Sequence, residues 1–95
     1  MKLIWSPEAR VDLREMVLYL SAKNPYAAKA LYQRIETFAT EIIDTPYIGR
    51  PGRVPGTREL VITNTPYILP YQIRSDFIEI LRVYHGARKW PKQFD

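Results

Sequence analysis

The chain contains no cysteine, a single histidine and no run of 18 consecutive apolar residues. The lack of cysteine excludes disulfides and thiolate metal sites, and one histidine cannot build an all-histidine site. We therefore expect no metal and no cofactor. A membrane-spanning helix needs about 20 apolar residues, and residues 1–10 lack the apolar segment of a signal peptide. These absences predict a soluble, cytoplasmic protein that does not bind a membrane.

The length and composition predict one domain that spans residues 1–95. A chain of 95 residues, of which 46% are hydrophobic and 25% charged, can bury one core but is too short for a second domain. The 14 basic residues outnumber the 10 acidic residues, which gives a formal net charge of +4. This charge favours an acidic partner, either a nucleic acid or an acidic protein segment. Simple solubility is the alternative reading of the same excess.

Residues 2–5 predict a short strand that leads directly into a helix. Ser6 can cap the helix N-terminus, Pro7 suits the first helical position, and Glu8 complements the positive end of the helix dipole. The apolar residues that follow recur at helical spacing and are Ala9, Leu13, Met16, Val17 and Leu20. The pattern indicates an amphipathic helix of about four turns, which breaks at residues 21–24.

A second helix is predicted after Asn24-Pro25, which repeats the pattern of a cap followed by a proline. Its apolar residues are spaced three and four apart and are Ala28, Leu31, Ile35, Phe38 and Ile42. The short connection between the two helices predicts an antiparallel hairpin. The second helix ends at residues 44–46, and residues 47–56 contain too many glycines and prolines for a regular element.

Residues 57–63, 67–74 and 77–85 each read as a strand, and the short breaks between them make neighbouring strands antiparallel. The middle run has one apolar face that we expect to cover the helices, formed by Tyr67, Leu69, Tyr71 and Ile73. Pro70 cannot donate a ladder hydrogen bond, so it is expected only at a sheet edge or a bulge. The predicted fold class is α+β, with an N-terminal strand, an antiparallel helix hairpin and a three-stranded antiparallel meander.

Four segments cover nearly the whole chain and carry a resemblance to a known family. They are WSPEARVDLREMVLYL (residues 5–20), GRPGRVPGTREL (49–60), YILPYQI (67–73) and IEILRVYHGARKWP (78–91). In this order they resemble the RelE/ParE superfamily of toxins from bacterial type II toxin–antitoxin modules, and more closely its ParE branch. The resemblance implies one of two activities. RelE-like members are ribosome-dependent endonucleases that cut mRNA, whereas ParE-like members target DNA gyrase, so particular residues must distinguish them.

The positions where a RelE-like nuclease places its cations favour the ParE branch. Metal-independent RNA cleavage needs several convergent basic side chains, which move protons and hold the developing charge. The resemblance places three of them at Glu59, Val61 and Ile68, which are acidic or apolar here. It therefore implies a gyrase inhibitor that is not itself an enzyme. The alternative is a metal-independent mRNA endoribonuclease that acts on the ribosome through Arg82, Tyr84, His85 and Arg88. A third reading is a basic interaction module without toxicity.

Two sets of residues are candidates for binding. For the target, gyrase or its bound DNA, they are the basic and aromatic residues Arg58, Arg82, His85, Arg88, Lys89 and Trp90. The resemblance also implies a cognate antitoxin that forms a hetero-oligomer with the chain. Its candidate contacts lie partly outside the helix core positions and are Val11, Leu18, Tyr19, Tyr26 and Tyr32. The alternative readings are a solvated basic strand end with Trp90 on the core, and partial burial of the tyrosines.

Overall fold

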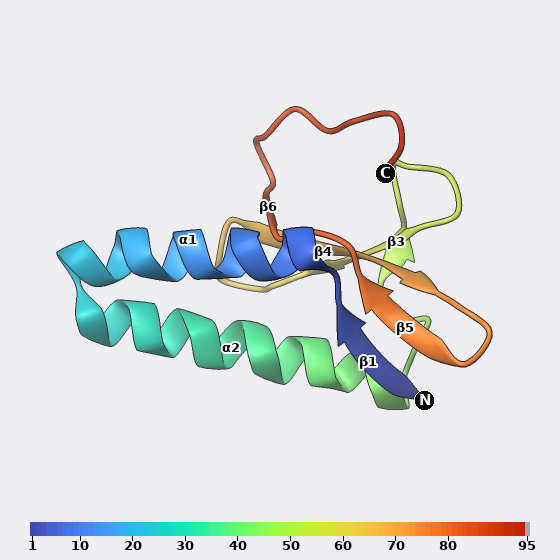
Figure 1. Ribbon diagram of the computed structural model, residues 1–95, viewed down its shortest axis with the longest axis horizontal. Coiled ribbons are helices and arrows are strands. Elements are labelled where there is room, and N and C mark those ends of the chain that lie inside the picture. The colour runs from blue at the N-terminus through green and yellow to red at the C-terminus, as the bar shows by residue number, and fades with distance from the viewer. Residues whose placement is uncertain (95) are drawn as a thin grey trace.

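Two antiparallel helices lie against one face of a mixed β-sheet in a computed structural model that describes residues 1–94 (Figure 1). The elements are, in chain order, β1 (Lys2–Trp5), α1 (Pro7–Lys23), α2 (Pro25–Asp44), β2 (Arg50–Pro51), β3 (Arg58–Val61), β4 (Tyr67–Ile73), β5 (Phe77–Ile80) and β6 (Tyr84–His85). The expected α+β fold is confirmed. Within residues 1–94, neither helix is long and apolar enough to cross a membrane.

Ser6 starts α1 and also fastens it to the sheet. Its hydroxyl oxygen accepts a hydrogen bond from the backbone N–H of Ala9 at 3.0 Å, which confirms the predicted cap. The same hydroxyl donates to the carbonyl of Leu81 at 2.8 Å, and the backbone N–H of Ser6 donates to Ile80 at 2.9 Å. The N-terminus of α1 is therefore held at the end of β5.

Asn24 alone connects the two helices. Its backbone N–H donates to the carbonyl of Leu20 at 2.8 Å, and its side-chain oxygen accepts from the N–H of Ala27 at 3.1 Å. Because one residue ends α1 and caps α2, the first helix continues to Lys23. The predicted break at residues 21–24 is therefore wrong in its extent, although the predicted hairpin is confirmed.

The sheet has β4 at its centre, in the order β1-β5-β4-β3-β2. β1 pairs parallel with β5, and the other neighbours pair antiparallel. The face expected to cover the helices does so, because Leu69 and Tyr71 are fully buried in the core and Tyr67 and Ile73 pack against it. The buried apolar residues of this core are Ala9, Ile35, Ala39, Ile42, Leu60, Ile62, Leu69, Tyr71, Ile78, Ile80 and Val83.

The third predicted strand is not continuous. β5 ends at Ile80, and β6 begins at Tyr84. Tyr71 of β4 lies opposite Ile80, and Ile68 lies opposite Tyr84, so two residues of β4 face three in the neighbouring chain. This extra residue is a β-bulge, which divides the predicted run of residues 77–85 into two short strands.

Pro70 lies opposite this bulge, in the central strand. Its carbonyl accepts a hydrogen bond from the N–H of Leu81 at 2.8 Å, and on its other side it pairs with Glu59. The sequence allowed either a sheet edge or a bulge for this proline, and the structure has it in the central strand opposite a bulge. The regular ladder is interrupted beside the proline, which has no N–H to donate.

The loop of residues 47–56 contains a strand that the sequence did not predict. β2 pairs antiparallel with β3, with Arg50 opposite Glu59 and Pro51 opposite Arg58. A proline is compatible with this position because β2 is an outer strand of the sheet. The pairing holds the middle of the loop against β3, which is itself shorter than the predicted run of residues 57–63.

Candidate interaction surfaces

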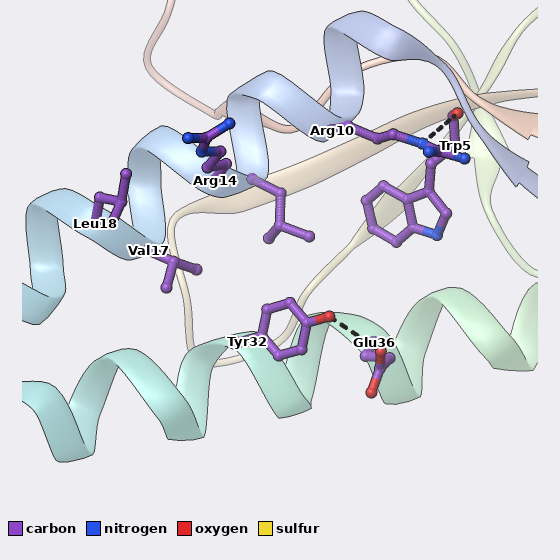
Figure 2. A pocket seen from close by; sticks show the side chains of 8 residues that line it. Trp5, Arg10, Arg14, Val17, Leu18, Tyr32 and Glu36 are labelled. Carbon is purple, nitrogen blue, oxygen red and sulfur yellow. Dashed lines mark hydrogen bonds between the residues drawn. The ribbon is translucent and has the colours of Figure 1, made fainter.

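A groove of about 510 Å³ lies between α1 and α2, and Figure 2 shows the side chains that line it. They are Trp5, Arg10, Leu13, Arg14, Val17, Leu18, Tyr32 and Glu36. Arg10 and Arg14 extend from α1, and Glu36 lies on α2 across the groove. The hydroxyl of Tyr32 donates to Glu36 at 3.3 Å, and Arg10 Nε donates to the carbonyl of Trp5 at 3.3 Å. The groove therefore combines an apolar floor with a basic and an acidic rim.

The groove is apolar because the rest of the protein covers little of the apolar surface of α1. Among the 17 residues of α1, all of them described, Ala9 is the one buried residue, whereas α2 buries four. Leu13 and Val17 are only half-buried. Burial of apolar area is worth about 25 cal/mol per Å², so a partner that covered these side chains would gain free energy that folding leaves unused.

The five predicted antitoxin contacts do not form one site. Leu18 and Tyr32 line the groove. Tyr19 lines a second hollow of about 620 Å³ on another side of α1, beside Asp12 and residues 64–67. Val11 and Tyr26 are exposed and line neither hollow. The structure therefore brings two of the five predicted residues together.

Sequence reasoning missed the other residues of the groove. Leu13 and Val17 fit the helical spacing of core residues, and that spacing does not tell whether a stripe is covered by the same chain or by a partner. Arg10 and Arg14 are four residues apart and therefore share a helix face, which is the signal that could have marked this rim. No comparable signal exists for Glu36, because its position depends on how the two helices pack.

A buried carboxylate organises the loop that precedes β3. Glu59 is 1% exposed, and Oε1 accepts hydrogen bonds from Nε and Nη2 of Arg50 at 3.1 and 3.0 Å. The other oxygen, Oε2, accepts from the backbone N–H of Arg53 at 2.7 Å, and Arg53 Nε lies 3.6 Å from Oε1. About half of each arginine side chain stays exposed, 51% and 45% respectively. Glu59 therefore fixes two guanidinium groups at the surface.

The C-terminal segment after β6 joins this loop through aromatic rings. The guanidinium of Arg53 lies 4.2 Å from the centroid of the Trp90 ring, and Trp90 packs edge-on against Tyr84 at 5.2 Å. On the same tyrosine, the guanidinium of Arg88 lies 4.3 Å from the ring centroid. These are cation–π distances. Trp90 therefore lies between the loop and the sheet, which agrees with the reading that placed it on the core.

Arg82 connects α1 to the chain between β5 and β6. Its Nε and Nη2 donate to the two carboxylate oxygens of Asp12 at 2.7 and 2.8 Å, and the N–H of Val83 donates to the same carboxylate at 3.0 Å. The hydrogen bonding of Arg82 to the carboxylate of Asp12 raises the pKa of Arg82 above its ordinary value. A raised folded-state pKa stabilises at every pH below the ordinary arginine value and is lost only in strong alkali. Arg82 therefore keeps its charge near neutral pH, so the ion pair is not lost there by deprotonation of Arg82.

Arg58 is also held by the protein itself. Its Nε donates to the carbonyl of Gly49 at 2.8 Å, and Nη2 donates to the carbonyl of Tyr47 at 3.3 Å. Of the predicted target contacts, Arg58 and Arg82 thus have structural partners, whereas Arg88 and Lys89 are exposed.

His85 forms part of a tight turn at the end of β6. Its Nδ1 accepts a hydrogen bond from the N–H of Ala87 at 3.1 Å, and its ring packs edge-on against Tyr67 at 5.9 Å. In a neutral imidazole ring, one nitrogen has a free lone pair and the other carries a proton. Because Nδ1 accepts this hydrogen bond, its lone pair is occupied and Nε2 is the nitrogen that can donate. Within residues 1–94, no group of three or more His, Asp or Glu side chains is arranged to hold a metal ion.

The comparisons with known proteins return toxins and toxin–antitoxin systems. A family model described as the ParE toxin of the type II toxin–antitoxin system parDE matches residues 3–90. Among curated proteins, the candidate toxin Y4kP of Sinorhizobium fredii is 41% identical over 88 residues, which cover 93% of this chain and 91% of that protein. Toxin RelE1 of Caulobacter vibrioides is 26% identical over 86 residues, which cover 88% and 91%.

The fold is also similar to a solved structure. A chain from the chromosomal ParDE toxin–antitoxin system of P. aeruginosa matches with a TM-score of 0.81 and 27% sequence identity. The match covers 90% of this chain and 95% of that chain. Sequence and structure therefore agree over nearly the full length.

Proposed function

Because the chain belongs to the ParE toxin family of type II toxin–antitoxin systems, we propose that it inhibits DNA gyrase and that a cognate antitoxin neutralises it. The observation that carries the choice against a nuclease is the environment of Glu59. At a position where the RelE-like resemblance expects a cation, the chain has a buried carboxylate that pairs with two arginines.

This arrangement opposes phosphate chemistry in two ways. The carboxylate cannot stabilise the negative charge that develops on a scissile phosphate, and its ion pairs hold Arg50 and Arg53 on the preceding loop, so neither guanidinium is free to take the place of the missing cation. Val61 and Ile68, at the other two expected positions, can neither donate a proton nor hold negative charge. Loss of one charge-stabilising donor typically costs about 3 kcal/mol of barrier, and here three are absent.

Two of the C-terminal residues that could replace those cations are already engaged by other groups of the protein. Arg82 is engaged by Asp12, and the lone pair of His85 Nδ1 accepts the N–H of Ala87. A general base needs a free lone pair within reach of the attacking hydroxyl. These contacts support a role in binding for the segment, in place of RNA cleavage.

The groove between the helices supports an antitoxin partner of a particular kind. An amphipathic helix could place its apolar side on Leu13, Val17 and Leu18. Acidic side chains on one flank of that helix would face Arg10 and Arg14. The proposal therefore seats a segment of the antitoxin in this groove, which leaves the sheet and the C-terminal segment for the target.

The experiment is a supercoiling assay with purified gyrase and relaxed plasmid, titrated with the full chain. We expect loss of supercoiled product and its recovery when the antitoxin encoded beside the toxin is added. Intact supercoiling at saturating toxin contradicts the proposal.

A parallel translation reaction, read by primer extension, tests the endonuclease alternative, because new 5′ ends at ribosomal A-site codons would replace gyrase by mRNA as the target. Growth arrest on induction, rescued by the antitoxin, excludes a harmless interaction module.

A further inference from the structure

The positive charge of the chain is concentrated in the half that follows the helices. Residues 1–44 contain six basic and six acidic side chains, whereas residues 45–94 contain eight basic and three acidic ones. One of those three acidic residues, Glu59, is buried. The surface formed by the sheet, the loop of residues 47–56 and the C-terminal segment therefore has an excess of cations, which suits an acidic partner.

Arg50 and Arg53 belong to this surface, although the sequence did not predict them as contacts. Glu59 limits the freedom of both side chains, and Arg53 is further held against the Trp90 ring. Each arginine nevertheless exposes about half of its side chain. An arginine that is already ordered loses less conformational entropy on binding than a free one. The loop thus offers two pre-positioned guanidinium groups.

The aromatic rings of this surface indicate what kind of acidic partner it fits. Arg53 lies over Trp90, and Arg82 and Arg88 lie over Tyr84 at 4.8 and 4.3 Å. Proteins that bind single strands use exposed rings as platforms for unpaired bases. Here guanidinium groups lie over Trp90 and Tyr84, and Arg58 lies over the exposed ring of Tyr47 in the loop at 5.2 Å, so the rings of this surface are already in contact with cations. Cations of this kind contact phosphates, whose spacing is regular on a duplex.

We propose that Arg50, Arg53, Arg88 and Lys89 form a contact surface for the phosphate backbone of duplex DNA. Glu59 is a positioning residue, because it holds the two loop arginines without touching the DNA. The inference deepens the proposed function, since gyrase acts on duplex DNA and a toxin that binds both could hold the complex together. Its biological role rests on that proposed function, but DNA binding is measured without gyrase, so the two fail separately.

The test measures binding of the full chain to a fluorescein-labelled duplex of about 20 base pairs by anisotropy, between 50 and 200 mM salt. The variants Arg50→Gln/Arg53→Gln and Arg88→Gln/Lys89→Gln each remove two cations, and we expect each to weaken binding about tenfold at the lowest salt. We expect the slope of log affinity against log salt to become shallower by up to about 1.8 for two lost phosphate contacts. Within residues 1–94 the side chains of Arg88 and Lys89 pair with no carboxylate, so the second variant tests the surface even if loss of both Glu59 partners impairs folding.

The matched control is Arg10→Gln/Arg14→Gln, which removes the same charge from the helix groove. We expect its affinity for DNA to stay within about twofold of the parent. If all three double variants weaken DNA binding equally, binding depends on net charge alone, and this result overturns the proposed contact surface. No DNA binding by the parent chain at 50 mM salt also overturns it, and tighter binding to a single-stranded RNA of equal length overturns the assignment to duplex DNA.

Glu59→Gln separates positioning from simple electrostatics. The change removes a negative charge, so electrostatics alone predicts tighter DNA binding. We expect weaker binding instead, because the arginines lose the carboxylate that orders them. Circular dichroism verifies the fold, and in a Trp5→Phe background the fluorescence of Trp90 reports whether Arg53 still packs on it. Tighter binding with an unchanged Trp90 signal rejects the positioning role.

Discussion

The helix hairpin and the C-terminal half of the chain differ in both charge and burial. Residues 1–44 have equal numbers of acidic and basic residues and leave apolar side chains exposed along α1, whereas the later half is basic and buries most of its aliphatic strand residues. An apolar groove and a cationic surface suit different partners. The groove binds a partner by burying apolar area, whereas the cationic surface attracts a partner with negative charge. We therefore assign the two surfaces to different partners in our proposal, the groove to the antitoxin and the cationic surface to the target.

The largest expected effect comes from breaking the link between the two regions. Asp12→Ala removes the carboxylate that binds Arg82 twice and the N–H of Val83 once. The two side chains are only 13% and 25% exposed, and loss of one partner from such an ion pair leaves a charge poorly compensated. We expect the free energy of unfolding in urea to fall by about 3 kcal/mol.

Glu15→Ala is the matched control for this prediction, since it removes an exposed carboxylate from the same helix. It should change stability by less than about 0.5 kcal/mol. A double-mutant cycle with Arg82→Ala isolates the coupling between the two charges. Equal stability of the Asp12 and Glu15 variants would mean that the two regions are not joined through this pair.

The sequence predicted the helix starts because their causes are local. Ser6 and Asn24 each cap a helix within three residues, and a proline follows each cap. The bulge opposite Pro70 depends on which residues of two strands face one another, and this register is set by the whole sheet. Sequence could indicate that the proline needed an irregular partner, but could not place the extra residue in the neighbouring chain.

The surfaces were predicted less completely than the fold. From the sequence, Glu59 was notable only because a RelE-like nuclease is expected to have a cation at its position. Its contacts with Arg50 and Arg53 depend on the pairing of β2 with β3. Tyr26 follows the cap of α2 and projects away from the groove, although its residue type suits a contact. Residue type therefore indicated which side chains could bind, and the packing of the elements decided which ones share a surface.

A smaller effect is expected from Leu18→Ala, which tests the groove without disturbing the core. Leu18 is exposed in the free chain, so we expect the free energy of unfolding to change by less than about 0.5 kcal/mol. A partner helix in the groove would bury this side chain, and its truncation should weaken antitoxin binding by about 1.5 kcal/mol, measured by calorimetry. The control is Tyr26→Ala, also exposed but outside the groove. If Tyr26→Ala weakens binding more than Leu18→Ala, the antitoxin uses another face.

The smallest effect is expected from a second ion pair that joins no separate regions. Arg74 Nη2 lies 2.8 Å from Glu79 Oε1, as short a contact as those of Asp12, but it lies within the β4–β5 hairpin and its side chains are 42% and 23% exposed. Water screens such a pair, and ordering its long side chains costs entropy, so Arg74→Ala should reduce stability by only about 0.5 kcal/mol. Urea unfolding at low and high salt checks this, because the difference from the parent should shrink with salt. A loss as large as that of Asp12→Ala would mean that distance alone, and not burial or the connection between elements, determines what an ion pair contributes in this fold.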